Sequence, residues 1–208
     1  MLSGIVLSGG ASSRMGREKG LTELAGKPLV GIVAEVLLQV ADEVIISVAK
    51  GMTKKYLRFV TANVRLAEDK HEGLGPMEGL VRSLTMCKGE YAVVAPCDVP
   101  FLRVAVCRTV AEAASGHDGA VPIVRGFAEP LHGAYLRRRA IEVFERHLVE
   151  GRLKLQDACA ELDLVAVPEE RIRMADPVLD SFWNLNSAEE LGRAEIRFRK
   201  SDSGTIPS

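Results

Sequence analysis

Apolar residues along the chain fall into two alternating patterns. Short β-branched runs predict buried strands, and they lie at residues 2–7, 44–48, 64–67, 91–95, 119–124, 131–136 and 164–167. Between most of them, apolar residues recur every three or four positions. This spacing predicts helices, which lie at residues 28–40, 53–59, 76–87, 103–114, 137–149 and 154–161.

The alternation predicts a three-layer α/β/α fold with a Rossmann-like, mostly parallel sheet. We expect one domain over residues 1–200 and a disordered polar tail over residues 201–208. An extended segment at residues 182–185 should lead into a final helix, capped by Ser187 with Glu190 three positions later, as in a capping box. In such sheets, ligands bind beyond the carboxyl ends of the strands.

The first strand runs into a segment rich in glycine and serine that carries two cations. Residues 8–19 read Ser-Gly-Gly-Ala-Ser-Ser-Arg-Met-Gly-Arg-Glu-Lys. Small residues allow backbone N–H groups to close around an anion, which Arg14 and Lys19 would neutralise. The segment is no P-loop, because Arg17 stands where Lys is required, and GxGxxG cannot be placed on its glycines. It predicts phosphate binding.

Three further polar residues are candidate ligands. Asp98 comes just after the strand at residues 91–95, at the same sheet edge as the glycine-rich segment. Its carboxylate suits Mg²⁺ as a ligand, and the alternative interpretation is a helix cap. Asn184 and Asn186 share one face if their backbone is extended. A turn with a helix cap is the alternative for this pair.

Composition narrows the class of protein. Apolar residues make up 47% and charged residues 26%, which is ordinary for a globular protein, and the net charge is -1. We therefore expect no nucleic-acid or membrane-surface partner. No apolar run approaches the ~20 residues of a membrane helix. The four cysteines and four histidines lack metal-ligand spacing, so we expect reduced thiols and a cytoplasmic location.

The motif that ends at Lys19, followed by Gly26-Lys27-Pro28-Leu29, resembles the signature of nucleotidyltransferases, which transfer NMP from an NTP. It is most similar to the molybdenum cofactor guanylyltransferases, because Gly9-Gly10 stands where related cytidylyltransferases usually have Ala-Gly. The resemblance implies a fold of the nucleotide-diphospho-sugar transferase type. It also implies Mg²⁺ as cofactor and transfer of GMP from GTP to the phosphate of a molybdenum or tungsten pterin (a molybdopterin-type acceptor), with release of pyrophosphate.

The resemblance assigns catalysis to Arg14, Lys19 and Asp98. It extends nucleotide binding to the loop and to one more aspartate: Leu7, Ser8, Gly9, Gly10, Ser12, Ser13, Lys19, Asp69 and Asp98. Asp69 is chosen because an aspartate precedes the family's Gly-Pro-Leu-x-Gly motif, which residues 75–79 match. Glu68 and Glu72 are alternatives, and a plain exposed carboxylate is another.

On the acceptor side, the segment Glu129-Pro130-Leu131 matches the family's Gln-Pro-Leu. The resemblance places Pro130 and Asn184 near the acceptor, and Asn186 with Asp98 at the metal. The chain departs from the family pattern at three places: Glu129 replaces Gln, Ala49-Lys50 replaces Asn-Arg, and Ser187 replaces Thr.

Two other functions remain open. One is a nucleotidyltransferase for another substrate, such as CTP with the pterin, a cobinamide phosphate or a sugar phosphate. The other is a non-catalytic GTP-binding subunit, although a sensor needs no metal for in-line displacement. The resemblance further implies transient contact with molybdenum-insertion proteins or target apoenzymes, and the sequence leaves the oligomeric state open.

Overall fold

The computed structural model describes residues 1–8 and 18–202, with side chains to residue 199. Its main sheet has the strand order β10-β7-β9-β6-β1-β4-β5, with β8 paired to β7. Neighbouring strands are parallel except at β9 and β8, which are antiparallel to their partners. The predicted mostly parallel sheet is confirmed. The strands are β1 Leu2–Leu7, β4 Glu43–Val48, β5 Val64–Glu68, β6 Tyr91–Pro96, β7 Gly119–Val124, β8 Phe127–Ala128, β9 Ala134–Leu136 and β10 Leu164–Val167.

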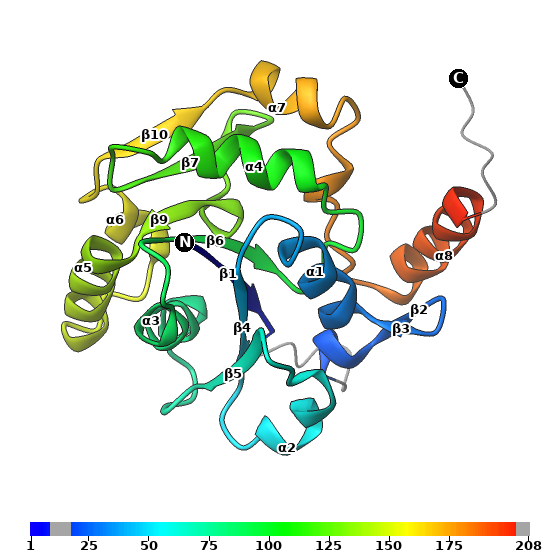
Figure 1. Ribbon diagram of the computed structural model, residues 1–208, viewed down its shortest axis with the longest axis horizontal. Helices are drawn as coiled ribbons and strands as arrows, with labels where there is room; N and C mark the ends of the chain where they lie inside the picture. The colour runs from blue at the N-terminus through cyan, green and yellow to red at the C-terminus, as the bar shows by residue number, and fades with distance from the viewer. Residues whose placement is uncertain (9–17, 203–208) are drawn as a thin grey trace.

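Helices cover both faces of this sheet (Figure 1). Side chains alternate along a strand, so in β1 Val6 joins one hydrophobic core, whereas Ile5 and Leu7 join the other. The predicted three-layer architecture is confirmed. The first core contains residues of α1 Leu29–Leu37, α2 Thr53–Tyr56, α4 Val104–Ala113 and α7 Glu169–Ala175; the second contains residues of α3 Pro76–Met86, α5 Arg137–Val149 and α6 Leu155–Cys159.

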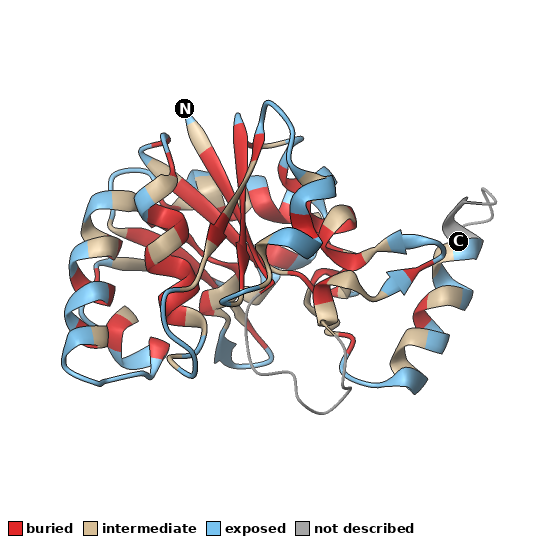
Figure 2. Cartoon of the chain, turned by 90° about the horizontal axis from the view of Figure 1, so that it is seen from below, coloured by how far each residue is buried: buried red, intermediate tan, exposed pale blue. Residues whose placement is uncertain are grey.

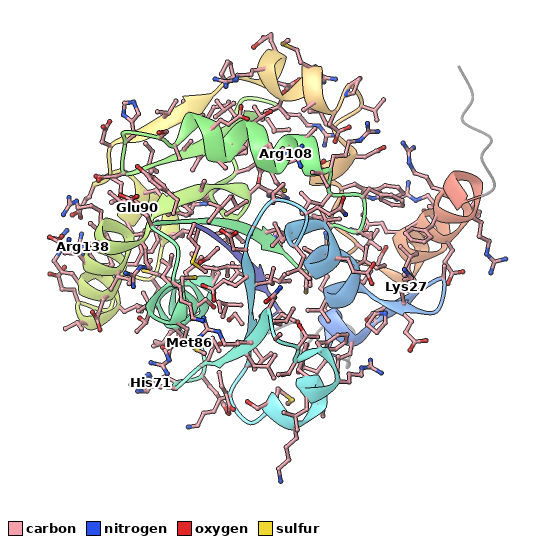
Figure 3. All side chains as sticks on the ribbon, viewed as in Figure 1. Lys27, His71, Met86, Glu90, Arg108 and Arg138 are labelled. Atoms are coloured by element: carbon pink, nitrogen blue, oxygen red, sulfur yellow. The ribbon has the colours of Figure 1, made fainter. Side chains whose placement is uncertain are left out.

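A small lobe stands at one side of the sheet (Figure 2). It consists of the hairpin β2 Glu23–Leu24 and β3 Lys27–Pro28, together with α8 Ala188–Asp202. Figure 3 labels Lys27 on this hairpin. The lobe has its own hydrophobic cluster, in which Leu24 and Leu185 are buried. The lobe thereby holds the segment before α8 against the edge where β1 and β6 end.

Two elements begin later than the sequence pattern predicts. Pro28 is not in the first helical turn: its backbone is extended, with ψ 137°, and pairs with Glu23 before α1 starts at Leu29. Leu131 is not in a strand, because residues Pro130–His132 form a 3-10 turn and β9 starts only at Ala134. At Pro28 the pairing with Glu23 keeps the backbone extended, although a φ of −60° would suit a helix. At Leu131 the preceding Pro130 occupies the start of the 3-10 turn, a position that suits proline.

The C-terminal third holds three more differences. Helix α7 was not predicted, because it buries only Ile172 and so lacks an apolar stripe. Phe182 ends a 3-10 turn, Asp180–Phe182, instead of starting an extended segment. Helix α8 includes residues 201 and 202 of the expected tail, and the rest of that tail lies outside the described residues. None of the described helices is long and apolar enough to cross a membrane.

Candidate functional site

Lys19, Asp98 and Asn186 meet at the carboxyl ends of β1 and β6. The Lys19 ammonium forms an ion pair with Asp98 Oδ2 and donates to Asn186 Oδ1 at 2.7 Å. The three residues are far apart in sequence, and they come from the segment after β1, the turn after β6 and the segment before α8. The structure therefore brings together one predicted phosphate ligand and both predicted metal ligands.

Local hydrogen bonds hold Asn186 at this place. The Leu185 N–H donates to the Asp98 carbonyl at 2.9 Å, which ties the segment to the turn after β6. Ser187 caps α8 by accepting from the Glu190 N–H at 3.1 Å. The Glu190 carboxylate accepts from the Asn186 N–H at 2.6 Å, one residue earlier than in a standard capping box. The predicted cap thus also orients a site residue.

The donor atoms suit a magnesium ion. Mg²⁺ prefers hard oxygen ligands and is usually held by one or two carboxylates together with substrate oxygens. The Asp98 side chain is only 13% exposed, and its Oδ1 has no hydrogen-bond partner among residues 1–8 and 18–199. The described residues contain no group of three or more His, Cys, Asp and Glu side chains that could hold a metal ion by themselves. One carboxylate and the Asn186 amide oxygen would leave most ligand positions to substrate oxygens and water.

The backbone at the end of β1 is already engaged in the sheet. The Leu7 carbonyl accepts from the Cys97 N–H at 3.0 Å, and the Ser8 N–H donates to the Ser47 carbonyl at 3.0 Å. The Ser8 hydroxyl lies 2.7 Å from the Tyr56 hydroxyl. The Ser8 N–H and hydroxyl are therefore both engaged inside the protein, whereas in the predicted phosphate cradle the N–H would face the ligand.

Asp69 lies at the same edge of the sheet, just after β5, but beside a different group of residues. Its Oδ1 and the Ser47 Oγ are buried without a hydrogen-bond partner in the described part of the chain. A methyl group at Gly79 would lie 2.4 Å from Ser47 Oγ and 3.4 Å from Asp69 Oδ1, so a larger residue would force Ser47 or α3 to move. Burial, followed by the negative charge of Glu78, raises the pKa of Asp69 to about 6.

The two alternatives to Asp69 differ from it in their surroundings. Glu68 accepts hydrogen bonds from the Gly51 N–H, at 2.5 Å, and from the Thr53 hydroxyl, and these bonds lower its pKa. Glu72 is exposed on the loop that precedes α3, near His71 at the molecular surface (Figure 3). Asp69 is thus the carboxylate with a buried, unpaired oxygen, and it remains our choice for nucleotide binding.

The predicted acceptor residues lie in separate elements. Pro130 is buried in its 3-10 turn, and its carbonyl accepts from the Tyr135 hydroxyl at 2.6 Å. Asn184 is half-buried, two residues before Asn186. Burial raises the pKa of the neighbouring Glu129, while Arg125 acts in the opposite direction.

Five predicted residues lie outside the part of the chain that the structure describes. These are Gly9, Gly10, Ser12, Ser13 and Arg14.

The sequence analysis overlooked two residues beneath the site, Tyr56 and Ser47, and included Gly79 only as part of a motif. Tyr56 was assigned only to a short helix, yet a buried tyrosine hydroxyl needs a hydrogen-bond partner, which was a usable signal. Ser47 lies within an apolar strand run, and the sequence does not show that it lies near Asp69 and Gly79 in the fold. These residues shape the edge of the sheet at which the predicted ligands lie.

Known proteins that are similar to this chain support the same family. Residues 4–171 match the family described as the MobA-like NTP transferase domain. The chain is 35% identical over 200 residues to a molybdenum cofactor guanylyltransferase of Desulfosudis oleivorans, covering 95% of this chain and 96% of that protein. It is 36% identical over 197 residues to a probable molybdenum cofactor guanylyltransferase of Methanosarcina acetivorans, covering 91% and 88%.

A solved structure is similar over nearly the whole chain. It is the molybdopterin-guanine dinucleotide biosynthesis protein A from Archaeoglobus fulgidus, with a TM-score of 0.81 and 28% sequence identity. The match covers 95% of this chain and 99% of that one. The relatives and the solved structure are thus similar to this chain across the region that carries Lys19, Asp98 and Asn186.

Proposed function

The chain belongs to the MobA-like NTP transferase domain family, and from this premise we propose that it is a guanylyltransferase. It transfers GMP from GTP to the terminal phosphate of a molybdenum or tungsten pterin, giving the guanine dinucleotide cofactor and pyrophosphate. The observation that carries the proposal is the meeting of Lys19, Asp98 and Asn186 at the carboxyl edge of the sheet. The names of its relatives support the choice of GTP and of the pterin acceptor.

The proposed reaction requires no covalent bond between the protein and the substrates. An oxygen of the acceptor phosphate forms a new bond to the α-phosphorus of GTP, and the bond from that phosphorus to the leaving pyrophosphate breaks. The attacking oxygen is already an anion, so no nucleophilic Ser, Cys or His side chain is needed. The protein must bring two anions together and offset their repulsion.

Each residue of the site has a part in this task. Lys19 supplies a positive charge where the triphosphate binds, and we assign Arg14 the same role. Asp98 and Asn186 would hold Mg²⁺, which supplies further positive charge at the reacting phosphate when it is bound. Asp69 binds the nucleotide from the end of β5, while Pro130 and Asn184 face the acceptor. The four cysteines are all free thiols, which is in keeping with a reducing, cytoplasmic location.

The test is pyrophosphate release from GTP, CTP, ATP and UTP in turn, with Mg²⁺ and a molybdopterin-type acceptor. Release from GTP alone, dependent on the acceptor and abolished by Asp98→Ala, supports the proposal. Release with CTP would keep the mechanism and change the product to a cytosine dinucleotide. GTP binding without release under any condition would indicate a binding protein and contradict the proposed activity.

A further inference from the structure

Tyr56 lies beneath the site, and no step of the proposed reaction uses it. It is fully buried at the end of α2. Its hydroxyl oxygen lies 2.7 Å from Ser8 Oγ and 3.4 Å from Glu18 Oε2. Ser8 is the last described residue after β1, and Glu18 immediately precedes Lys19. One side chain therefore contacts residues on both sides of the glycine-rich motif.

The hydrogen bonds have a defined direction. An ionised carboxylate only accepts, so Tyr56 donates to Glu18 and the Ser8 hydroxyl donates to Tyr56. Burial raises the pKa of Tyr56 far above its ordinary value, and the phenol keeps its proton at neutral pH. Ser8 thus donates to Tyr56 and Tyr56 donates to Glu18, so each hydroxyl uses its one proton in one hydrogen bond.

Gly20 completes this contact on the other side of Lys19. A methyl group at Gly20 would lie 2.0 Å from Ser8 Oγ and 3.0 Å from the Tyr56 hydroxyl. Only a residue without a side chain lets the 3-10 turn Lys19–Leu21 rest on this pair of hydroxyls. The neighbours of Lys19 on both sides thus lie against Tyr56, while the Lys19 side chain extends to Asp98 and Asn186.

We propose that Tyr56 is a positioning residue, which holds the backbone of Lys19 so that its ammonium meets the triphosphate at the site of Asp98 and Asn186. The inference rests on the proposed function, because it takes Lys19 to be the ligand of GTP. Loss of the hydroxyl would leave the aromatic ring in the core, and would let the segment from Glu18 to Gly20 drift. Small displacements of a positioned charge are costly to a reaction that depends on orientation.

The test compares four proteins: wild type, Tyr56→Phe, Lys19→Ala and the double variant. GTP affinity is measured by calorimetry with Mg²⁺ present, and GMP transfer by pyrophosphate release. We expect Tyr56→Phe to weaken GTP binding and to lower kcat/KM, each by about tenfold. In the Lys19→Ala background the same change should alter GTP affinity by less than about twofold, because the group that Tyr56 positions is gone.

The matched control is Tyr91→Phe, which removes a tyrosine hydroxyl at the opposite end of the sheet, where it donates to the His117 carbonyl at 3.0 Å. It should leave GTP affinity and kcat/KM unchanged. Equal losses from Tyr56→Phe in both backgrounds, or no loss in either, would overturn the inference. If Tyr56→Phe fails to fold, Glu18→Ala interrupts the same contact from a partly exposed position and should give the same pattern.

The two proposals can fail separately. A wild-type protein that binds GTP but transfers no GMP contradicts the proposed function, while the affinity comparison still tests Tyr56. A wild-type protein that transfers GMP, with a Tyr56→Phe variant equal to it, contradicts the positioning role alone. A wild-type protein that neither binds nor turns over GTP contradicts both.

Discussion

The two ends of the sheet hold different kinds of carboxylate. At the amino end, Glu43 is buried and has hydrogen-bond partners on both oxygens. At the carboxyl end, Asp98 and Asp69 each have one oxygen without a partner in the described chain. Glu43 accepts from the Ser3 hydroxyl at 2.9 Å, the Lys88 N–H at 2.6 Å and the Arg65 guanidinium at 2.6 Å.

The difference also shows in the pKa values. Burial raises the pKa of Glu43, but the hydrogen bonds from Lys88, Ser3 and Arg65 outweigh it, so the pKa is lowered overall. For Asp69 burial prevails, and the pKa rises to about 6. A paired carboxylate stabilises the fold, while an unpaired one is held at a cost that a ligand can offset. We therefore interpret Glu43 as a structural carboxylate and Asp98 and Asp69 as candidate functional ones, and four substitutions test this difference.

The largest effect should follow from Asp98→Asn. The amide keeps the shape but removes the negative charge that pairs with Lys19 and would bind Mg²⁺. We expect kcat for GMP transfer to fall by roughly 10³-fold, since electrostatic stabilisation of the reacting phosphate is lost. The midpoint of thermal unfolding should shift by only a few degrees. A large loss of stability with kcat retained would make Asp98 a structural residue like Glu43.

Glu43→Gln should show the converse. The amide cannot accept hydrogen bonds on its nitrogen, so one of the Ser3, Lys88 and Arg65 donors loses its partner inside the protein. We expect the free energy of unfolding in urea to fall by about 3 kcal/mol. The kcat of the folded variant should equal that of wild type, because Glu43 lies at the far end of the strands. A lowered kcat with unchanged stability would contradict the comparison.

Asp69→Asn tests the cost of an unpaired carboxylate. The native pKa of about 6 lies above the ordinary value of 3.8, so the folded protein binds more protons between these values. The free energy of unfolding of the wild type should therefore fall as the pH rises from about 4 to about 6, and then level off. The neutral amide removes this dependence and should stabilise the protein by about 1–2 kcal/mol at pH 7.5.

The same Asp69→Asn variant should bind GTP more weakly, because it lacks the carboxylate that we propose as a nucleotide ligand. Urea unfolding at pH 4 and pH 7.5, with calorimetric GTP titration, measures both effects. Glu72→Gln is the matched control, since Glu72 is an exposed carboxylate on the following loop. If the free energy of unfolding of Asp69→Asn changed with pH as that of the wild type does, the ionised Asp69 carboxylate would not destabilise the fold.

The smallest effect should come from Asn186→Ala. It removes the acceptor that lies 2.7 Å from the Lys19 ammonium and leaves the ion pair with Asp98 in place. We expect kcat/KM to fall by about tenfold, the size of one lost hydrogen bond to a charged group. Asn184→Ala is the comparison variant, and it should raise KM for the acceptor while leaving GTP affinity unchanged. If Asn186→Ala and Asn184→Ala changed GTP affinity equally, the separate roles proposed for the two asparagines would be wrong.

The layers of this protein and its family could be predicted from the sequence. The β-branched runs and the helical spacing are local signals, and they predicted β1, β4 and β6 and the helices α1, α3, α4 and α5. The resemblance of the motif that ends at Lys19, followed by Gly26-Lys27-Pro28-Leu29, predicted the nucleotidyltransferase family, which is confirmed. Local rules failed at Pro28, which pairs in a hairpin, at Leu131, which lies in a 3-10 turn, and at α7, which lacks an apolar stripe.

The pairing of polar groups depends on packing that no sequence pattern contains. The Ser8 hydroxyl lies against Tyr56, whereas Asp69 Oδ1, near Gly79, has no hydrogen-bond partner in the described chain. These neighbours lie on elements that are distant in sequence, and hydrogen bonds form over about 3 Å, whereas sequence patterns locate an element to within a few residues. The pattern therefore predicts the edge of the sheet where the site lies, and the packing of that edge sets the charge and position of each side chain.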